Sequence, residues 1–182
     1  MSYPFDWIFS SLDVVKHCIK DDFSDFLNKS YYSVIGSHQC NHLLFKQFGI
    51  DRFFMHHNPY YDDYEYFLRC VESFKNLMST KCQKLFFISY ADINEDDVDI
   101  YKQKVVDFNN FFQNHTINYY MLCLIHVKGI NDPPSHYIYN RDNVDIIILK
   151  ASSINIGTKF ENNIDNLYLD GIIKNLYSFE LK

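Results

Sequence analysis

Three long apolar runs constrain the fold of this chain more than any other feature of its sequence. They cover residues 84–90, 119–127 and 144–149, and each is nearly continuous rather than alternating between apolar and polar residues. Strands buried on both faces have this pattern, because helices cover both sides of their sheet. Helical patterns or long connections separate the runs. The sequence therefore predicts an α/β fold with an open, largely parallel sheet of at least three central strands flanked by helices.

Apolar residues that recur at three and four positions predict the helices. The clearest helix follows Asp62, which can cap it while Glu65 occupies the third helical position. The apolar stripe of this helix consists of Tyr64, Phe67, Leu68, Val71, Phe74, Leu77 and Met78. Further helices are expected after Ser10-Ser11, around Phe23–Leu27, from Val98 to Phe112 and from about Asn163 to Tyr177.

Length and composition describe an ordinary globular chain. It has 182 residues, of which 47% are hydrophobic and 18% aromatic, and such a chain can bury a substantial core. No internal repeat, low-complexity tract or linker interrupts it. Residues 1–182 are therefore expected to form a single α/β domain.

Charge and cysteine usage exclude several classes of function. The net charge of −6 disfavours nonspecific binding to nucleic acid, which needs a basic face. No apolar run reaches the roughly 18 to 20 residues of a membrane span, and no secretory signal is visible. The five cysteines lack paired spacing, which favours reduced thiols in the cytoplasm. We expect a cytoplasmic protein that binds neither nucleic acid nor membranes. Because no phosphate-binding glycine loop is present, we expect no cofactor.

The opening segment Tyr3-Pro4-Phe5-Asp6-Trp7 places an acid between two large aromatic residues. A carboxylate that is buried among aromatic rings needs a partner for its charge. Asp6 is therefore either a structural lock or the carboxylate of a functional site, and the sequence leaves both alternatives open.

Two adjacent histidines, His56 and His57, form the sharpest local motif after the opening segment. On an extended segment their side chains point in opposite directions, so one could face a cleft as a general base near neutral pH. The alternative is that both are loop histidines that hydrogen-bond to backbone groups.

Cys40 follows a small-residue turn, and a short helix is expected shortly after it. A thiol at a helix N-terminus is more acidic and more nucleophilic, because the positive end of the helix dipole favours the thiolate. Paired with a histidine such as His57 and oriented by Asp6, it would form a Cys–His–Asp arrangement. A structural role for Cys40 is the alternative.

Residues 40–69 also contain residue types that bind metals or anions. The residues Cys40, His42, His56 and His57 lie within eighteen positions, but their spacing does not match a structural zinc site, so no metal is expected. Arg69, on the helix that follows, could clamp a carboxylate or phosphate or pair with Asp6. A surface ion pair is the alternative for Arg69.

Three segments together resemble a known family. They are SYPFDWIFSS at residues 2–11, FMHHN at residues 54–58 and YEYFLRCVESF at residues 64–74. They are similar to segments of a family described as papain-like cysteine peptidases, with members in large DNA viruses, bacteria and plants. Phe160 and the segment 165–169 also resemble the C-terminal pattern of that family.

The resemblance implies a cysteine-dependent hydrolase of viral type. His57 or His56 would be the base, Asp6 would orient it, and Arg69 and Trp7 would contact a peptide or protein substrate. In the family, a Gly-x-x-Cys element that supplies the candidate nucleophile precedes the Pro-Phe-Asp-Trp motif. The printed sequence begins directly before that motif, so we expect either that Cys40 takes the role of nucleophile or that the protein is inactive.

Two alternatives to a hydrolase stay open at this point. A catalytically inactive homologue would act as a module that binds a host or viral protein. An α/β enzyme of another class, such as a transferase, would use Asp6, His57 and Arg69 around a sugar or a phosphate. An exposed sheet edge or apolar patch would also allow a homo-oligomer to form.

Overall fold

The structure is a computed structural model of the chain and describes residues 2–6, 8–129, 133–155 and 159–178. The chain divides into two compact units, residues 1–81 with 110–117 and residues 82–109 with 118–182. The expectation of a single domain over residues 1–182 stays a prediction. Among the described residues, no helix is long and apolar enough to cross a membrane.

The second unit is built on a four-stranded sheet with the strand order β3-β4-β6-β5. β3 pairs with β4 and β4 pairs with β6 in parallel, whereas β5 and β6 are antiparallel. The predicted α/β fold with a largely parallel sheet is confirmed, and the three apolar runs are β3, β4 and β6. The strands are β3 (Lys84–Ile93), β4 (Tyr119–Lys128), β5 (Ser135–Arg141) and β6 (Val144–Ala151).

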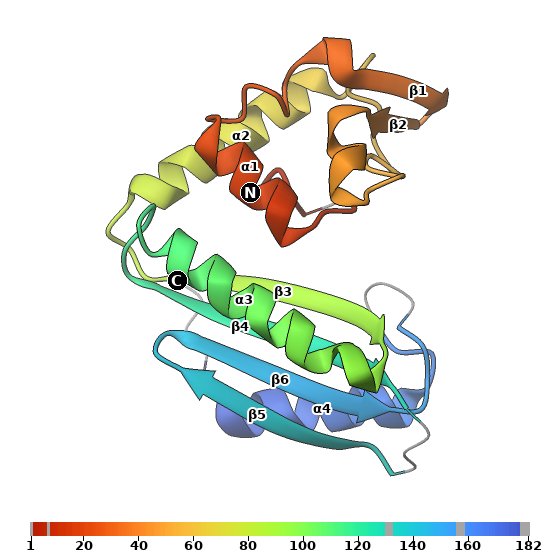
Figure 1. Ribbon diagram of the computed structural model, residues 1–182, viewed down its shortest axis with the longest axis vertical. Helices are drawn as coiled ribbons and strands as arrows, with labels where there is room; N and C mark the ends of the chain where they lie inside the picture. Colours follow the sequence, from red (N-terminus) through yellow and green to blue (C-terminus); the bar gives the residue numbers. More distant parts are fainter. Residues whose placement is uncertain (1, 7, 130–132, 156–158, 179–182) are drawn as a thin grey trace. The chain divides into compact units, whose positions relative to one another are not determined.

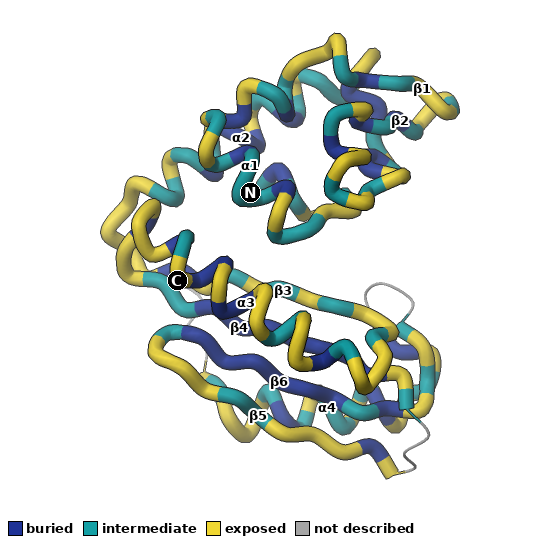
Figure 2. The backbone as a smooth tube through the Cα atoms, in the orientation of Figure 1, coloured by how far each residue is buried: buried dark blue, intermediate teal, exposed yellow. Residues whose placement is uncertain are grey.

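Two helices, α3 (Val98–Phe112) and α4 (Asn163–Leu176), lie on opposite faces of this sheet (Figure 1). Beneath α4, Leu124 of β4 and Leu149 of β6 form a core with Ile172 of the helix. Because both faces are covered, β4 is buried without interruption over residues 121–127, and β4 and β6 appear as the continuous buried strands of Figure 2. Double-sided burial explains the unbroken apolar runs of β4 and β6. The prediction that β3 is also buried on both faces is wrong, because β3 is an edge strand with Leu85 and Phe87 exposed.

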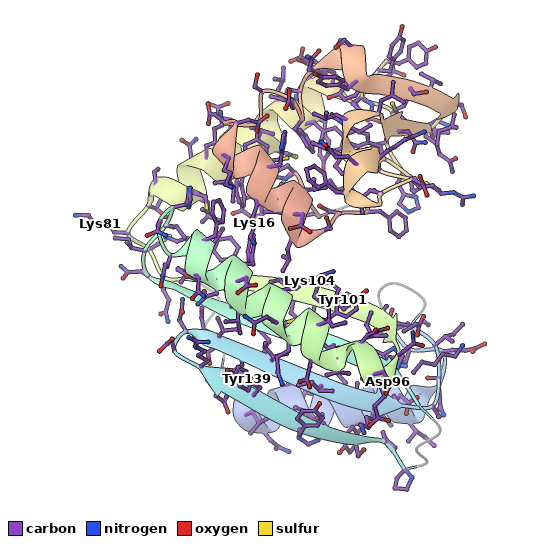
Figure 3. All side chains as sticks on the ribbon, in the orientation of Figure 1. Lys16, Lys81, Asp96, Tyr101, Lys104 and Tyr139 are labelled. Atoms are coloured by element: carbon purple, nitrogen blue, oxygen red, sulfur yellow. The ribbon has the colours of Figure 1, made fainter. Side chains whose placement is uncertain are left out.

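The connection between β3 and α3 is acidic. A short 3₁₀ helix, η3 (Glu95–Asp97), leads directly into α3, and Asp96 lies at the start of that helix (Figure 3). Negative charge is favourable there because it faces the positive end of the helix dipole. Farther along α3, the Nζ atom of Lys104 lies 5.0 Å from the centre of the Tyr101 ring (Figure 3).

The first unit combines two helices with a β-hairpin. The hairpin is antiparallel and has an irregularity between Val34 and Gly36. On its other side, the second strand makes an isolated bridge between Cys40 and Phe54. The elements are α1 (Leu12–Lys20), η1 (Lys29–Tyr31), β1 (Tyr32–Gly36), β2 (Gln39–His42), η2 (Leu44–Phe48) and α2 (Tyr64–Ser79).

Phenylalanine rings fill the core of the first unit. Phe26 is fully buried and packs edge-on or tilted against the rings of its neighbours, at centroid distances between 5.7 and 6.5 Å. Phe5 of the opening segment joins this cluster and also packs 5.8 Å from Phe74 of α2. The opening segment is therefore part of the core through Phe5 rather than through its acid. The neighbours of Phe26 are Phe5, Phe23, Phe45, Phe53, Phe54 and Phe67.

The chain turns sharply after α1 instead of forming the short helix expected around Phe23–Leu27. Asp22 and Phe23 both have a left-handed backbone, with φ of 56° and 63°. The amide of Phe23 donates to the carbonyl of Cys18 over 2.7 Å, which closes the end of α1. Two consecutive left-handed residues cannot continue a right-handed helix, so this segment consists of turns.

Candidate functional site

The predicted base His57 lies in the loop before α2 and contacts two residues near the start of that helix. Its Nδ1 atom is 3.5 Å from Oδ2 of Asp63, and its ring stacks on Tyr66 at 4.9 Å with an angle of 16° between the planes. Asp63 also accepts a hydrogen bond from the Asn58 amide over 2.7 Å. The acid beside His57 is therefore Asp63, whereas the sequence predicts Asp6.

Tyr66 connects this histidine to a thiol one helical turn farther along. The Tyr66 hydroxyl donates a hydrogen bond to the Cys70 thiol, and the Ser2 side chain also hydrogen-bonds to that hydroxyl. Burial raises the pKa of Cys70, the nearby Asp6 carboxylate raises it further, and Tyr66 and Arg69 work in the opposite direction. Cys70 is only 3% exposed. The Cys70 thiol, which lies near the predicted acid Asp6, is thus held in its neutral form.

Cys40 is placed as a structural residue. It is fully buried, its backbone pairs with Phe54 in both directions, and its thiol donates to the carbonyl of Asn41 over 3.3 Å. Burial raises the pKa of the Cys40 thiol, against the smaller effect of the Ser33 and Tyr60 backbone amides. No imidazole is among the groups that shift this pKa. Cys40 lies on the strand β2 and not at a helix N-terminus, so no helix dipole makes its thiol more acidic.

Within the described part of the chain, no hydrogen bond, ion pair or ring contact joins His57 to the other predicted site residues. Asp6 is exposed, and its Oδ2 atom accepts a hydrogen bond from the Tyr3 amide over 2.7 Å within the opening segment. His56 and Arg69 are exposed as well. Trp7 lies outside the described residues. Asp6 and Arg69 do lie close enough to Cys70 of α2 to affect its pKa.

One group of the described residues has ligand atoms close enough for a metal ion. His17, Asp21 and Asp25 place one ligand atom each within 4.8 Å of the others, with His17 Nε2 at 2.7 Å from Asp25 Oδ2. Asp21 Oδ1 is buried and has no hydrogen-bond partner in the described part of the chain. Acidic groups of this kind are common without a metal, and here His17 Nε2 also lies 3.6 Å from Asp21 Oδ2. Among the predicted metal-type residues, His42 instead stacks on Phe45 at 3.8 Å.

The second unit has its own polar cluster where the parallel strands end, which is where ligands bind in open α/β sheets. His126 is fully buried at the end of β4, with Nδ1 at 3.1 Å from Asp92 Oδ1, and the ring of Phe160 packs on it at 4.7 Å. Asp165 of α4 is 1% exposed and accepts hydrogen bonds from the amide and hydroxyl of Ser153. Burial lowers the pKa of His126. His126 and Asp165 are buried whereas Asp92 is exposed. The hydrogen bonds between Ser153 and Asp165 tie the segment just after β6 to α4.

Comparisons of the chain with protein-family models, with curated proteins and with solved structures gave no match. The site therefore has to be interpreted from its own geometry. In the first unit that geometry contains the pair of His57 and Asp63. It also contains the thiols Cys18, Cys40 and Cys70, which are all buried and have raised pKa values.

Proposed function

We propose that this protein is a cytoplasmic protein-interaction module without cysteine chemistry, and an inactive homologue of the papain-like cysteine peptidases that it resembles. The observation that carries this proposal is the burial of two thiols of the first unit, Cys40 and Cys70. Cys40 is fully buried and Cys70 is 3% exposed, and burial raises both pKa values. A nucleophilic cysteine needs the thiolate and access to a carbonyl carbon, and neither condition is met here.

A surface suited to a protein partner lies at the hairpin of the first unit. We define the hairpin patch as Val34, Ile35, Tyr60 and Tyr61, whose exposed fractions are 38%, 52%, 45% and 59%. The irregular register between Val34 and Gly36 leaves both apolar side chains of β1 outside. Figure 2 shows the tip of this hairpin as exposed backbone. Apolar and tyrosine side chains gathered in this way are typical of binding surfaces rather than of scattered surface residues.

Asn58 holds the two halves of the hairpin patch together. This residue is 3% exposed, and its side-chain amide donates to the carbonyls of Gly36 and Ser37 over 3.1 and 3.3 Å. Its Oδ1 atom accepts from the Tyr60 amide, so the tyrosine turn is tied to the hairpin tip. A surface fixed before binding loses less conformational entropy when a partner docks. We propose a protein partner that inserts apolar side chains between the tyrosine pair and Ile35.

Binding is tested in two steps. A partner protein is first isolated by its binding to the purified protein, and the affinity of this defined complex is then measured. Ile35→Asp and Tyr61→Asp are expected to weaken binding by at least about tenfold, because each places a charge in the apolar contact. The matched control is Leu167→Asp, which changes an equally exposed leucine of the second unit. Equal affinity for all four proteins would refute the hairpin patch as the binding surface.

A cysteine hydrolase is the second candidate, and the row of His57, Tyr66 and Cys70 is the observation that favours it. Purified protein is therefore assayed with peptide, ester and isopeptide substrates. The proposal expects no turnover above a His57→Ala variant. Turnover that is lost in both His57→Ala and Cys70→Ala would establish the hydrolase instead.

A further inference from the structure

A small cavity of about 270 Å³ lies within the first unit, apart from the hairpin patch. The end of α1, the second half of α2 and the loop after α3 surround it. This volume is just below the roughly 300–1,000 Å³ of pockets that hold drug-sized ligands, so it suits a smaller molecule.

The floor of the cavity is apolar. The rings of Phe23 and Phe74 are nearly buried and meet edge-on at 5.6 Å, and Ile19 and Met78 complete the lining. Methionine adapts its shape readily, and aromatic edges and faces accept flat apolar groups. The floor therefore favours an aliphatic or aromatic side chain.

The rim of the cavity carries one charge of each sign. Lys75 Nζ lies 2.7 Å from Asp22 Oδ2, and the same Nζ is 6.0 Å from the centre of the Phe23 ring. Two other polar residues of the lining are engaged within their own segments. Ser79 donates to the carbonyl of Asn76, and His115 Nδ1 lies 3.0 Å from the carbonyl of Phe111. The ion pair is thus the principal recognition element at the rim.

The backbone holds this ion pair above the apolar floor. Asp22 occupies the left-handed position after α1 that glycine usually takes, and Phe23 beside it is left-handed as well. A left-handed phenylalanine is costly, and such strain is found where a fold fixes functional groups. Here it turns the Phe23 ring into the floor while Asp22 stays at the rim.

We propose that this cavity binds a free amino acid with an apolar or aromatic side chain. The ligand carboxylate pairs with Lys75, its ammonium group pairs with Asp22, and its side chain packs on Phe23, Phe74 and Met78. A zwitterion fits better than a simple anion or cation, because it replaces the Asp22–Lys75 ion pair by two ion pairs, each between opposite charges. An ion of one sign would leave one rim charge facing a like charge. The proposal does not depend on the hairpin patch.

The test is calorimetric titration of the intact chain with L-phenylalanine, L-leucine and L-methionine. Four analogues that each lack part of the ligand are titrated for comparison. Phenethylamine lacks the carboxylate, 3-phenylpropanoate lacks the ammonium group, N-acetylphenylalaninamide lacks both charges and glycine lacks the side chain. Saturable binding of the apolar amino acids is expected, with affinities at least about tenfold above those of the four analogues. Absence of binding by the three amino acids, or equal binding of N-acetylphenylalaninamide, would overturn the proposal.

Substitutions at the rim of the cavity test whether the ligand binds there. Lys75→Met and Asp22→Asn keep the size of each side chain, and both are expected to weaken phenylalanine binding by about tenfold or more. The matched controls Lys46→Met and Asp51→Asn change exposed charges elsewhere in the same unit and should bind as the parent does. Circular dichroism verifies that all four variants are folded. Unchanged affinity in folded Lys75→Met and Asp22→Asn would contradict this site.

Discussion

At the scale of single residues, burial decides the chemistry of this protein more than sequence motifs do. His42 is the clearest case, because its ring is 1% exposed, stacks on Phe45 and places Nε2 at 3.0 Å from the carbonyl of Asp25. Burial lowers its pKa to about 4, which outweighs the opposing effect of Asp25. His42 is therefore a neutral core residue at neutral pH.

This gives a prediction for the pH dependence of folding. The pKa of His42 is about 4 in the folded protein and about 6.5 in the unfolded chain. The unfolded chain therefore takes up the proton first, and as the pH falls from about 6.5 to about 4 the free energy of unfolding decreases by about 3 kcal/mol. Denaturant unfolding at several pH values measures this slope.

The variant His42→Phe keeps an aromatic ring at the same position but cannot be protonated. It is expected to be less stable at neutral pH, because the contact with Asp25 is lost, yet its stability should fall less between pH 6.5 and pH 4. Parallel pH profiles of the parent and this variant would show that His42 does not titrate as described.

The sequence locates chemical groups but not their environments, and the candidate site illustrates this. Asp6 and Arg69 do lie close to a thiol of α2. The motif does not indicate that Asp6 is exposed, that Cys40 is on a buried strand or that Asp63 is the acid beside His57. These properties depend on which segment covers each residue, and such contacts join positions far apart in the chain.

At the scale of elements, local signals identify the cap of α1 but not that of α2. The prediction that Asp62 caps α2 is wrong, because the N-cap is Asp63 and its side chain makes no capping hydrogen bond. The Ser10-Ser11 pair predicts the start of α1, and in the structure Ser11 is the cap, accepting a hydrogen bond from the Val14 amide over 3.3 Å. We predict that Ser11→Ala lowers the free energy of unfolding by about 1 kcal/mol, because this amide loses its acceptor. Ser10→Ala is the matched control and should change stability by less than half as much. Equal effects of the two substitutions in denaturant unfolding would contradict the assigned cap.

Strands are predictable here where they form long apolar runs, and this includes the edge strand β3 although alternate residues of it are exposed. β4 and β6 form unbroken apolar runs and are evident from the sequence, whereas β5 has a mostly exposed pattern and is not. β5 forms because a two-residue turn at Asp142, with φ of 52°, folds it back on β6. The β1–β2 hairpin is not evident from the sequence for the same reason, since its outer side chains are exposed. Pairing with a neighbour, rather than apolar periodicity, creates these strands.

At the scale of the whole molecule, the two units divide the chemical groups between them. The first unit holds the aromatic core, the hairpin patch, the predicted site residues and the amino-acid cavity. The second unit holds a largely parallel sheet, with His126, Asp165 and Phe160 buried near its strand ends. It also has exposed apolar residues, of which Leu167 and Leu176 line a pocket on α4.

The central claim, that neither Cys40 nor Cys70 acts as a nucleophile, is tested most directly by alkylation of the native protein. Each cysteine is followed by mass spectrometry after a brief exposure to iodoacetamide at neutral pH. Cys82, which is exposed, should react, while Cys40 and Cys70 should react only after denaturation. Rapid labelling of Cys40 or Cys70 in the native protein, slowed by His57→Ala, would reveal an activated thiolate and contradict the account.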